Sequence, residues 1–583
     1  MSFLNNIFNS KEEIKDINVD LPIKSLKYPK DMMYKAIEES SKKYPNNTAI
    51  EYYGKKLSYK DFHNKVETVA KSLKYIGVEP GDRVTICTPN TPEAIIFFYA
   101  INMVGGTASM IHPLSSVNEI EYYLEVAKSE FILTVNLFAD KVVSASRKAK
   151  VKKIIIADVT ESITGFAKIA LNFYNKFIKR NSKKEELPTG EDILTWPKFY
   201  NLGCNYDGEF KHEGNYDDEA VILYSGGTTG KPKGIRLSNK NFNALGTQCF
   251  NMTGAKSGDS VLVVLPIFHG FGIGVSVHTL LMNGMNCVLV PQFKANEFVK
   301  LIKKHKPVFL AGVPTMYEAL CEQKEDSNYL SCVKNCICGG DLLSKNLNDK
   351  VNDYLKKHGS TAQIRTGYGL SECTAACVLT PKNYYQENGI GLPLPGNSVK
   401  IVKPGTTKEL KEEKIGEICV TGPTVMLGYL NETEENKDTL KLHEDGKVWL
   451  HTGDLGSKDK NGYIFFRSRL KRMIVTSGYN VYPSYMEKII VSHPAVKGCV
   501  VVGIPHPYKK QVPVACIVLE DDYKENEETT QSIKDYCSLS IAKYSMPYRY
   551  HYVKSIPKTL LGKINYKKLE EECTKKYEKK SWE

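Results

Sequence analysis

The sequence has no uninterrupted apolar segment of the length that a membrane-spanning helix needs, about 20 residues. One long uncharged run, residues 94–110, contains Asn102 and the adjacent glycines Gly105 and Gly106. We therefore expect this run to form a buried helix followed by a strand. Residues 1–16 contain acidic side chains where a secretory signal would have an apolar core. This favours a cytoplasmic protein.

The sequence also lacks the paired cysteine spacing of common zinc sites, although it contains 15 cysteines. The densest group is Cys332, Cys336 and Cys338, and no second cysteine pair or histidine lies near it in the sequence. A reducing compartment disfavours disulfides, and a buried free cysteine behaves as a small apolar residue. We expect these three cysteines to be core residues.

No segment concentrates charge of one sign. The formal net charge of +13 is spread along 583 residues, and the pI of about 8.8 lies below the range typical of nucleic-acid-binding domains. We expect anionic small molecules as partners and no nucleic acid. The composition, 42% hydrophobic and 25% charged, is that of a globular protein, and the length predicts two or more domains.

The most informative stretch is a glycine-rich loop that follows the apolar run 221–224. The run predicts a buried strand. Glycines allow backbone N–H groups to approach a polyphosphate closely, and hydroxyls and lysines add donors and positive charge. The loop differs from the common GxxxxGK loop, because a serine replaces its first glycine and Pro232 follows the lysine. A phosphate cradle is the favoured interpretation, and a polar strand-to-helix turn is the alternative. The residues are Ser225, Gly226, Gly227, Thr228, Thr229, Gly230, Lys231 and Lys233.

Five further segments carry residues suited to nucleotide or acid chemistry, and each has a structural alternative when taken alone. His269, with Phe271 and Gly272 after it, could face a substrate, although a lone histidine is usually structural. Gly340 and Asp341 follow a strand and expose backbone on which a flat ring could stack, or they form a plain turn. The other three segments are 366–372, 452–454 and 556–563.

Residues 366–372 place Tyr368 between glycines and end on Glu372. A nucleotide site needs a ring against the base and an oxygen ligand for Mg²⁺, whereas the alternative is a surface glutamate that caps a helix over 373–379. Asp454 ends an apolar run, and its carboxylate could accept hydrogen bonds from ribose hydroxyls or belong to a turn. Lys563 follows a glycine turn and, taken alone, is a solvated surface charge.

The element pattern predicts an α/β fold. Residues 30–77 predict a helix, a short hairpin and a helix. Strands are predicted at 83–87, 131–135, 153–157, 220–224, 261–265, 287–290 and 308–311, with helical segments between them. This alternation predicts largely parallel sheets that helices cover on both faces. After residue 395 short strands predict a small antiparallel β subdomain, and after residue 467 a small α+β C-terminal domain begins. The predicted boundaries are 1–467, a hinge at 468–471, and 472–583.

Residues 165–180 predict an amphipathic helix with a basic face. Such a helix could lie on an anionic membrane surface, which would make the protein peripheral at the membrane. Packing against its own domain is the favoured alternative, because most amphipathic helices face a protein core.

Considered together, these motifs resemble the adenylate-forming (AMP-binding) superfamily over residues 30–570. They occur in the order SGGTTGKPKG, PIFHGFG, GGD, GYGLSE, TGD, SRLKRMI, SGYNVYP and PKTLLGK. Within the superfamily the chain is most similar to acyl-CoA synthetases, in the neighbourhood of bacterial medium- and long-chain fatty acid–CoA ligases. The resemblance implies ATP, Mg²⁺ and CoA, formation of acyl-AMP with release of pyrophosphate, transfer of the acyl group to CoA, and a mobile C-terminal domain.

The resemblance also implies a role for each matching residue. The catalytic residues would be Lys563, His269, Thr228 and Glu372, of which Glu372 and Thr228 would bind Mg²⁺. His269, Phe271 and Gly272 would line the acyl pocket, Ser477, Gly478 and Tyr479 would bind CoA, and Lys471 would be the hinge. The ATP- and AMP-binding residues would be Ser225, Gly226, Gly227, Thr228, Thr229, Gly230, Lys233, Gly340, Asp341, Thr366, Gly367, Tyr368, Gly369, Ser371, Asp454, Arg469 and Lys563.

The sequence departs from the family pattern mainly in its C-terminal part. Ser468 replaces the usual Asp or Gly, Tyr485 replaces a glutamate, and His506 and Lys510 replace acidic and glycine positions. These departures affect the thiol acceptor more than adenylation, so an acyl-carrier-protein phosphopantetheine stays an alternative to CoA.

The motif around His269 helps to predict the class of carboxylic acid that is the substrate. Amino-acid-activating relatives place an aspartate in this motif, and a buried ammonium without a partner would be costly. A fatty acid is therefore favoured and an aryl acid is second. A non-enzymatic scaffold is disfavoured, because a scaffold has no use for Lys563. The acyl chain length and the oligomeric state stay open.

Overall fold

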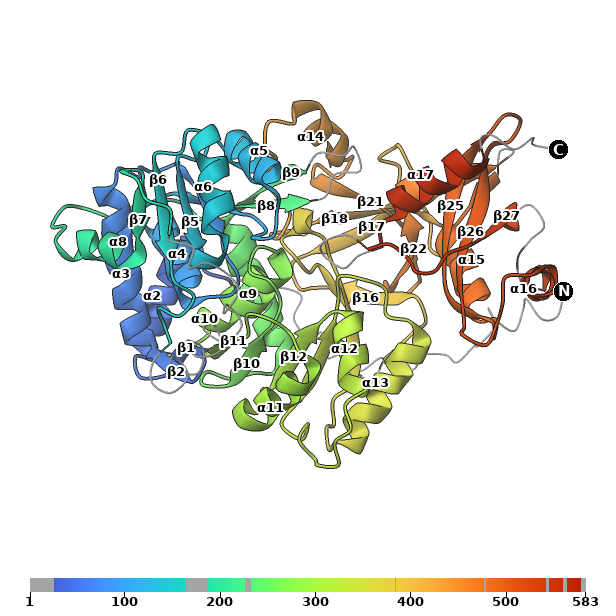
Figure 1. The fold of residues 1–583 in the computed structure, drawn as a ribbon, viewed down its shortest axis with the longest axis horizontal. Coiled ribbons are helices and arrows are strands. Elements are labelled where there is room, and N and C mark those ends of the chain that lie inside the picture. Colours follow the sequence, from blue (N-terminus) through green and yellow to red (C-terminus); the bar gives the residue numbers. More distant parts are fainter. Residues whose placement is uncertain are drawn as a thin grey trace. The chain divides into compact units, whose positions relative to one another are not determined.

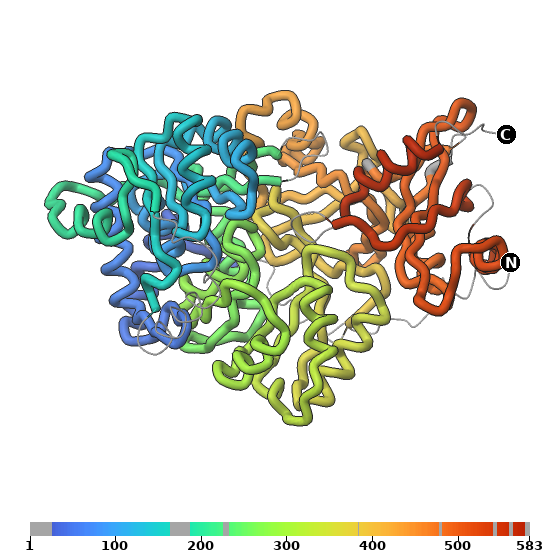
Figure 2. Tube along the Cα trace, viewed as in Figure 1, coloured from blue at the N-terminus to red at the C-terminus, as the bar shows by residue number. Residues whose placement is uncertain are grey.

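A computed structural model describes residues 26–163, 187–225, 232–382, 384–476, 479–539, 541, 545–558 and 564–577, except for the side chains of Lys471, Tyr479 and Asn480. The chain forms two compact units (Figure 1). The first contains residues 1–387, 391–398 and 421–437, and the second contains 388–390, 399–420 and 438–583. The red end of the trace in Figure 2 belongs to the second unit.

The largest sheet of the first unit has the strand order β19-β9-β8-β4-β3-β5-β6-β7. The strands from β8 to β7 are parallel, whereas β9 is antiparallel to both β8 and β19. The bounds are β3 Arg83–Cys87, β4 Thr107–Met110, β5 Phe131–Val135, β6 Lys153–Ala157, β7 Ile193–Thr195, β8 Glu219–Ser225, β9 Lys233–Ser238 and β19 Gly428–Tyr429.

Helices cover this sheet because its central strands are apolar on both faces. All five residues of β5 are buried, and Ile132 packs in one core with α5 (Val117–Ala127) and α6 (Ala139–Lys148). Figure 1 shows α5 and α6 beside β5 and β6. The run at 94–110 forms the fully buried helix α4 (Pro92–Met103) and then β4, as predicted. Thr91 caps α4 by accepting a hydrogen bond from the Ala94 backbone.

Two smaller sheets complete the first unit. One has the order β10-β11-β1-β2 and is parallel except for the β1–β2 hairpin. In the other, β12, β13 and β14 are parallel and lead into antiparallel β15 and β16. The strands are β1 Thr48–Tyr52, β2 Lys55–Ser58, β10 Ser260–Val263, β11 Asn286–Leu289, β12 Phe309–Gly312, β13 Asn335–Cys338, β14 Ile364–Tyr368, β15 Val378–Leu379 and β16 Gly389–Pro393.

Helices α11, α12 and α13 share one buried core with the β12–β14 sheet. Cys336 and Cys338 are buried in that core and Cys332 packs against it, as predicted, and all 15 cysteines of the chain are free. The remaining helices of the first unit are α2 Met33–Lys43, α3 Tyr59–Tyr75, α8 Trp196–Cys204, α9 Asn239–Thr253, α10 Thr279–Leu281, α11 Ala295–His305, α12 Pro314–Cys321, α13 Lys345–Lys357 and α14 Thr433–Thr439.

The second unit begins with the predicted antiparallel subdomain, in which β18, β20 and β22 pair with β21. Its C-terminal part contains a sheet with the strand order β24-β23-β26-β25, in which β27 also pairs with β26. The strands are β17 Ser398–Val402, β18 Gly416–Thr421, β20 Leu440–Leu442, β21 Val448–Lys458, β22 Ile464–Arg469, β23 Ile474–Thr476, β24 Tyr479–Val481, β25 Val496–His506, β26 Lys510–Leu519 and β27 Arg549–Tyr552.

Alternation along β25 gives this C-terminal sheet two cores. Val501 packs with α15 (Pro483–Val491) and α16 (Glu527–Ser538), whereas Val500 packs with α17 (Tyr566–Tyr577). The predicted α/β class, with parallel-rich sheets, a small antiparallel part and an α+β C-terminal part, is confirmed. The boundaries at 468–471 stay a prediction, as does the mobility of the C-terminal domain.

In the described part of the chain, no helix combines the length and the apolarity that crossing a bilayer requires. The predicted amphipathic helix at 165–180 lies outside the described residues, so its contact with a membrane stays a prediction.

Glu219 links three strands of the large sheet and gives a test of this fold. It accepts hydrogen bonds from Arg83 Nε at 2.9 Å and from Arg236. Burial opposes its ionisation, but the two arginines outweigh burial and hold the pKa of Glu219 below its usual value. We expect Glu219→Gln to lower stability at pH 7 by about 2 kcal/mol, because it leaves two partly buried cations without their charged hydrogen-bond partner.

The loss of stability expected in Glu219→Gln should be largest near neutral pH and should disappear in acid. A lowered folded-state pKa stabilises above the unfolded-state value of about 4.3, and this contribution disappears as the pH falls through the folded-state pKa. The midpoint of thermal unfolding should therefore differ between wild type and Glu219→Gln at pH 7 and converge in acid. The exposed Glu209→Gln is the control. An equal deficit at every pH would contradict the ionic role.

Candidate nucleotide-binding site

The predicted phosphate loop joins two antiparallel strands. β8 ends at Ser225, which pairs with Lys233 at the start of β9. The alternative of a strand-to-helix turn is therefore wrong, because a strand follows the loop. The loop residues Gly226, Gly227, Thr228, Thr229, Gly230 and Lys231 lie outside the described residues, and their contact with phosphate stays a prediction.

Lys233 lies in a network that reaches Glu372. Its Nζ is 2.5 Å from Glu435 Oε1 and 5.4 Å from the centre of the Tyr429 ring. The Tyr429 hydroxyl donates to Glu372 Oε1 at 2.9 Å. Glu435 lies in α14 and Tyr429 in β19. Neither residue was predicted, because neither belongs to one of the sequence motifs described above.

Glu372 lies in a single 3-10 turn, Ser371–Cys373, and β15 follows that turn. The alternative of a glutamate capping a helix over 373–379 is wrong. The Glu372 carbonyl accepts a hydrogen bond from the Met426 backbone at 2.9 Å, so both its main chain and its carboxylate are held. A fixed, half-buried carboxylate has the hard oxygen donors that Mg²⁺ prefers, and the residue fits the predicted metal role.

Close main-chain contacts bring three predicted motifs together. A Cβ on Gly270 would lie 1.8 Å from the Thr374 carbonyl oxygen, and one on Gly339 would lie 3.1 Å from the Gly367 carbonyl oxygen and 3.3 Å from the Phe271 ring. The motifs containing His269, Gly340 and Tyr368 therefore meet although about 100 residues separate the first from the last. We expect such convergence at a binding site and not from three unrelated turns.

His269 is held as a neutral side chain within this cluster. The Phe271 backbone donates to its Nδ1 at 3.3 Å, which places the ring proton on Nε2. Gly272 allows the tight turn, since a Cβ there would lie 1.9 Å from the Pro266 carbonyl oxygen. A π-helical segment, Phe271–His278, follows, and such segments are frequent at functional sites.

The predicted adenine-framing residues lie at the ends of β13 and β14. Gly340 is exposed with a φ of +82°, and the exposed Asp341 accepts a hydrogen bond from the Leu342 backbone at 2.8 Å. The Thr366 backbone donates to Thr380 Oγ1 at 2.9 Å. Gly367 and Tyr368 pair with β15, Gly369 is exposed, and Ser371 and Tyr368 are half-buried.

The predicted ribose-binding pair lies in the second unit. Asp454 on β21 and Arg469 on β22 are cross-strand partners, and Arg469 Nε lies 3.1 Å from Asp454 Oδ1. Asp454 is buried and Arg469 is 60% exposed. Ser477, Gly478, the side chain of Tyr479 and Lys563 lie outside the described residues, as does the side chain of the predicted hinge residue Lys471.

Comparison with known proteins identifies the family. The chain matches the AMP-binding enzyme model over residues 37–430 and the AMP-binding enzyme C-terminal domain model over residues 485–563. It belongs to the AMP-binding enzyme family. The predicted resemblance is therefore confirmed.

Curated relatives of this AMP-binding enzyme include acid–CoA ligases. It is 32% identical to a long-chain-fatty-acid–CoA ligase of Bacillus subtilis (strain 168), over 96% of this chain and 97% of that one. It is 28% identical to a probable 4-coumarate–CoA ligase 3 of Dictyostelium discoideum, over 88% and 91%. The crystal structure of ATP-bound MatB from Rhodopseudomonas palustris has a TM-score of 0.80 at 23% identity, covering 94% of this chain and all of that one.

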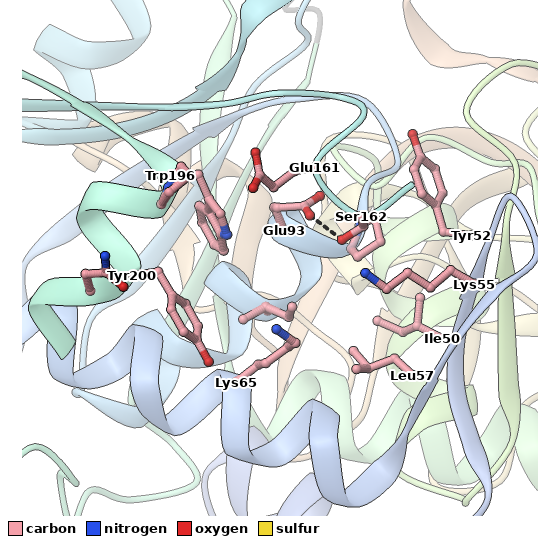
Figure 3. Close-up of a pocket in the computed structure, with 14 residues that line it drawn as sticks. Ile50, Tyr52, Lys55, Leu57, Lys65, Glu93, Glu161, Ser162, Trp196 and Tyr200 are labelled. Atoms are coloured by element: carbon pink, nitrogen blue, oxygen red, sulfur yellow. Dashed lines mark hydrogen bonds between the residues drawn. The ribbon is translucent and has the colours of Figure 1, made fainter. Parts of the chain in front are cut away.

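A cavity of about 250 Å³ lies elsewhere in the first unit, among Tyr52, Lys55, Glu93, Trp196 and Tyr200 (Figure 3). The Glu93 carboxylate accepts a hydrogen bond from Ser162, and burial raises the pKa of Glu93. None of the predicted site residues that the structure describes lines this cavity.

The contact between Gly270 and Thr374 makes a testable prediction. In Gly270→Ala the new Cβ would force the two loops apart, because a carbonyl oxygen on the main chain cannot turn away as a side chain can. Overpacking of this kind costs about 1–3 kcal/mol, and we expect ATP to bind roughly tenfold more weakly by calorimetry.

Gly498→Ala is the matched control. A Cβ on Gly498 would meet the terminal carbon of Ile556 at 3.2 Å, which is the flexible end of a side chain. ATP affinity in that variant should be unchanged. Wild-type ATP affinity in folded Gly270→Ala would contradict the assignment of these loops to the nucleotide site.

Proposed function

We propose that this AMP-binding enzyme is an ATP-dependent acid–thiol ligase that activates a medium- or long-chain fatty acid as acyl-AMP and transfers the acyl group to CoA. Adenylate formation and an acid–CoA ligase reaction follow from family membership and from relatives that match this chain almost end to end. The observation that carries the proposal is the meeting of the His269, Gly340 and Tyr368 motifs. The proposal that the acid is a fatty acid goes beyond what family membership supports.

In the first step a carboxylate oxygen of the acid attacks the α-phosphorus of ATP, and pyrophosphate leaves with the electrons of the broken P–O bond. Because both reactants are anions, positive charge must neutralise them in the transition state. Ser225, the loop at 226–230 and Lys563 would bind the phosphates. Glu372 and Thr228 would hold Mg²⁺, which supplies charge neutralisation when bound.

His269 suits the carboxylate in this step. Its Nδ1 accepts the Phe271 backbone N–H, so Nε2 carries the proton and can donate to a carboxylate oxygen. A neutral imidazole can orient the substrate carboxylate by a hydrogen bond without transferring a proton to it, so the carboxylate keeps its negative charge as the nucleophile. The side chain therefore positions the acid, while cations elsewhere neutralise the phosphates.

In the second step the CoA thiolate attacks the acyl carbonyl carbon, and AMP leaves. Ser477, Gly478 and Tyr479 would contact the pantetheine arm, and the domain after 468–471 would turn about Lys471 between the two steps. Asp454 would accept hydrogen bonds from the ribose hydroxyls, with its carboxylate held by Arg469.

The residues after His269 favour an apolar acid. The segment Phe271–His278 contains no acidic residue, and Ile273, Val275 and Val277 within it are buried. An amino-acid substrate would therefore bury its ammonium group without a carboxylate from this segment. An aryl acid fits the same absence of charge, and the 4-coumarate–CoA ligase relatives keep it as the second candidate.

The proposal predicts which acids support turnover. Pyrophosphate release from Mg-ATP should require a medium- or long-chain fatty acid and should increase several-fold when CoA is added. Acetate, benzoates, 4-coumarate and amino acids serve as the comparison panel. A preference for an aryl acid would change the proposed substrate class from fatty acids to aryl acids. Pyrophosphate release that does not change when CoA is added would favour a carrier protein as acceptor. No release with any acid would overturn the ligase.

Lys563 separates the two half-reactions. We expect Lys563→Ala to slow adenylation roughly 10²–10³-fold, the usual loss when one stabilising cation or donor is removed. Transfer to CoA from supplied acyl-AMP should stay within a few-fold of wild type. Lys558→Ala, an exposed lysine of the same segment, is the control for both assays. An equal loss of rate in the two half-reactions would contradict the assignment of Lys563 to adenylation alone.

A further inference from the structure

Cys419, His443 and His451 form a buried cluster in the antiparallel part of the second unit. Cys419 on β18 and His451 on β21 are direct cross-strand partners, and His443 follows β20, which also pairs with β21. The three side chains are 0%, 4% and 7% exposed. One thiol or imidazole atom from each lies within 4.8 Å of the other two. The cluster brings together three groups that bind soft metal ions.

The proton positions in the cluster suit a metal ligand. His451 Nδ1 lies 2.8 Å from Glu417 Oε2, and a carboxylate can only accept there, so Nδ1 carries the proton. Nε2 of His451 therefore has its lone pair free to face His443, whose Nε2 is 3.0 Å away. A carboxylate that holds the far nitrogen of an imidazole is the usual outer partner of a metal-bound histidine.

A hydrogen bond joins the two rings when no metal is bound. Because His451 Nε2 carries no proton, His443 Nε2 must donate to it, and metal binding at His443 Nε2 would move that proton to His443 Nδ1. A cation between the rings takes the place of the shared proton and uses both Nε2 lone pairs. With Zn–N bonds of about 2.0–2.1 Å in a tetrahedron, the two nitrogens need to separate by only a few tenths of an ångström.

We propose that Cys419, His443 and His451 bind one Zn²⁺ ion, with Glu417 orienting His451 and a solvent molecule as fourth ligand. Sulfur and imidazole donors select zinc over Mg²⁺ or Ca²⁺. The proposal is independent of the ligase function, since none of these residues belongs to the nucleotide motifs.

The charges around the cluster balance a divalent cation. The Cys419 thiolate and the Glu417 carboxylate supply two negative charges. Lys400 is near, but it is 3.4 Å from Asp445 Oδ2 and lies over the Trp449 ring at 4.1 Å, so its charge is already compensated. Zinc binding forms the S–Zn bond, breaks the S–H bond of the Cys419 thiol and releases one proton to solvent.

The site would stabilise the turn that carries Asp454. Glu417 uses its second oxygen to accept the Gly453 backbone N–H at 3.1 Å, and Gly453 directly precedes Asp454. A metal that fixes His451 also fixes Glu417, and Glu417 fixes this turn. Zinc would therefore have a structural role next to the predicted ribose-binding carboxylate.

The test uses the full chain, freed of metal by a chelator and then titrated with Zn²⁺ or Co²⁺. We expect one zinc per chain by elemental analysis, and with Co²⁺ a thiolate-to-cobalt charge-transfer band together with tetrahedral d–d bands. Cys419→Ser should lose the charge-transfer band and the bound metal. Glu417→Gln, which keeps all three ligands, should weaken zinc affinity roughly 10–100-fold.

Cys499→Ser is the matched control, since Cys499 is a buried strand cysteine of the same unit. It should bind zinc as wild type does. If Cys419→Ser fails to fold, His443→Gln at the end of β20 gives the same comparison. Zinc should raise the midpoint of thermal unfolding of the wild type and of Cys499→Ser, but not that of Cys419→Ser or His443→Gln. A wild type that retains no zinc, or a Cys419→Ser variant that retains as much as wild type, would overturn the site.

Discussion

The nucleotide site depends on main chains that approach more closely than any side chain would allow. Gly270 lies against the Thr374 carbonyl, Gly369 against the Ala375 carbonyl, and Gly272 against the Pro266 carbonyl, with less than 2 Å for a Cβ in each case. The last two contacts form tight turns within one loop each, after β14 and after β10, and the first contact joins those two loops. The two loops follow strands of different sheets, so the sheets position the candidate site and the glycines allow the loops to meet.

The sequence predicted the strands well where burial on both faces makes them uniformly apolar. The strands at 83–87, 131–135 and 153–157 were placed residue for residue. The end of β10 was placed two residues late, and the structure gives the reason. Asn90 donates from its side-chain amide to the carbonyls of Val263 and Leu265, so a residue about 170 positions away ends the strand. Local pattern carries no information about such a partner.

The candidate site shows the same division. The resemblance named His269, Glu372 and Asp454 as candidates because each lies in a contiguous motif. It named neither Glu435 and Tyr429 nor the Cys419–His451 pair, which come together only when distant segments pack. The register of β18 on β21 sets Cys419 opposite His451, and nothing in a single sequence specifies that register. Candidates that belong to a contiguous motif could therefore be named from the sequence, whereas candidates defined by neighbours in space could not.

The position of Lys233 bears on the electrostatics of the whole reaction. Its side chain is 10% exposed, its ammonium group lies 2.5 Å from Glu435, and the centre of the Tyr429 ring lies 5.4 Å from that group. Moving Lys233 onto a phosphate would leave the Glu435 carboxylate without its cation, which offsets the gain. At the start of β9, the charge of Lys233 is therefore already balanced by Glu435. Under the proposed function, a bound triphosphate would therefore obtain most of its compensating charge from the metal ion proposed on Glu372 and from Lys563. That proposed role of Lys563 would give a physical reason for the predicted mobility of the C-terminal domain.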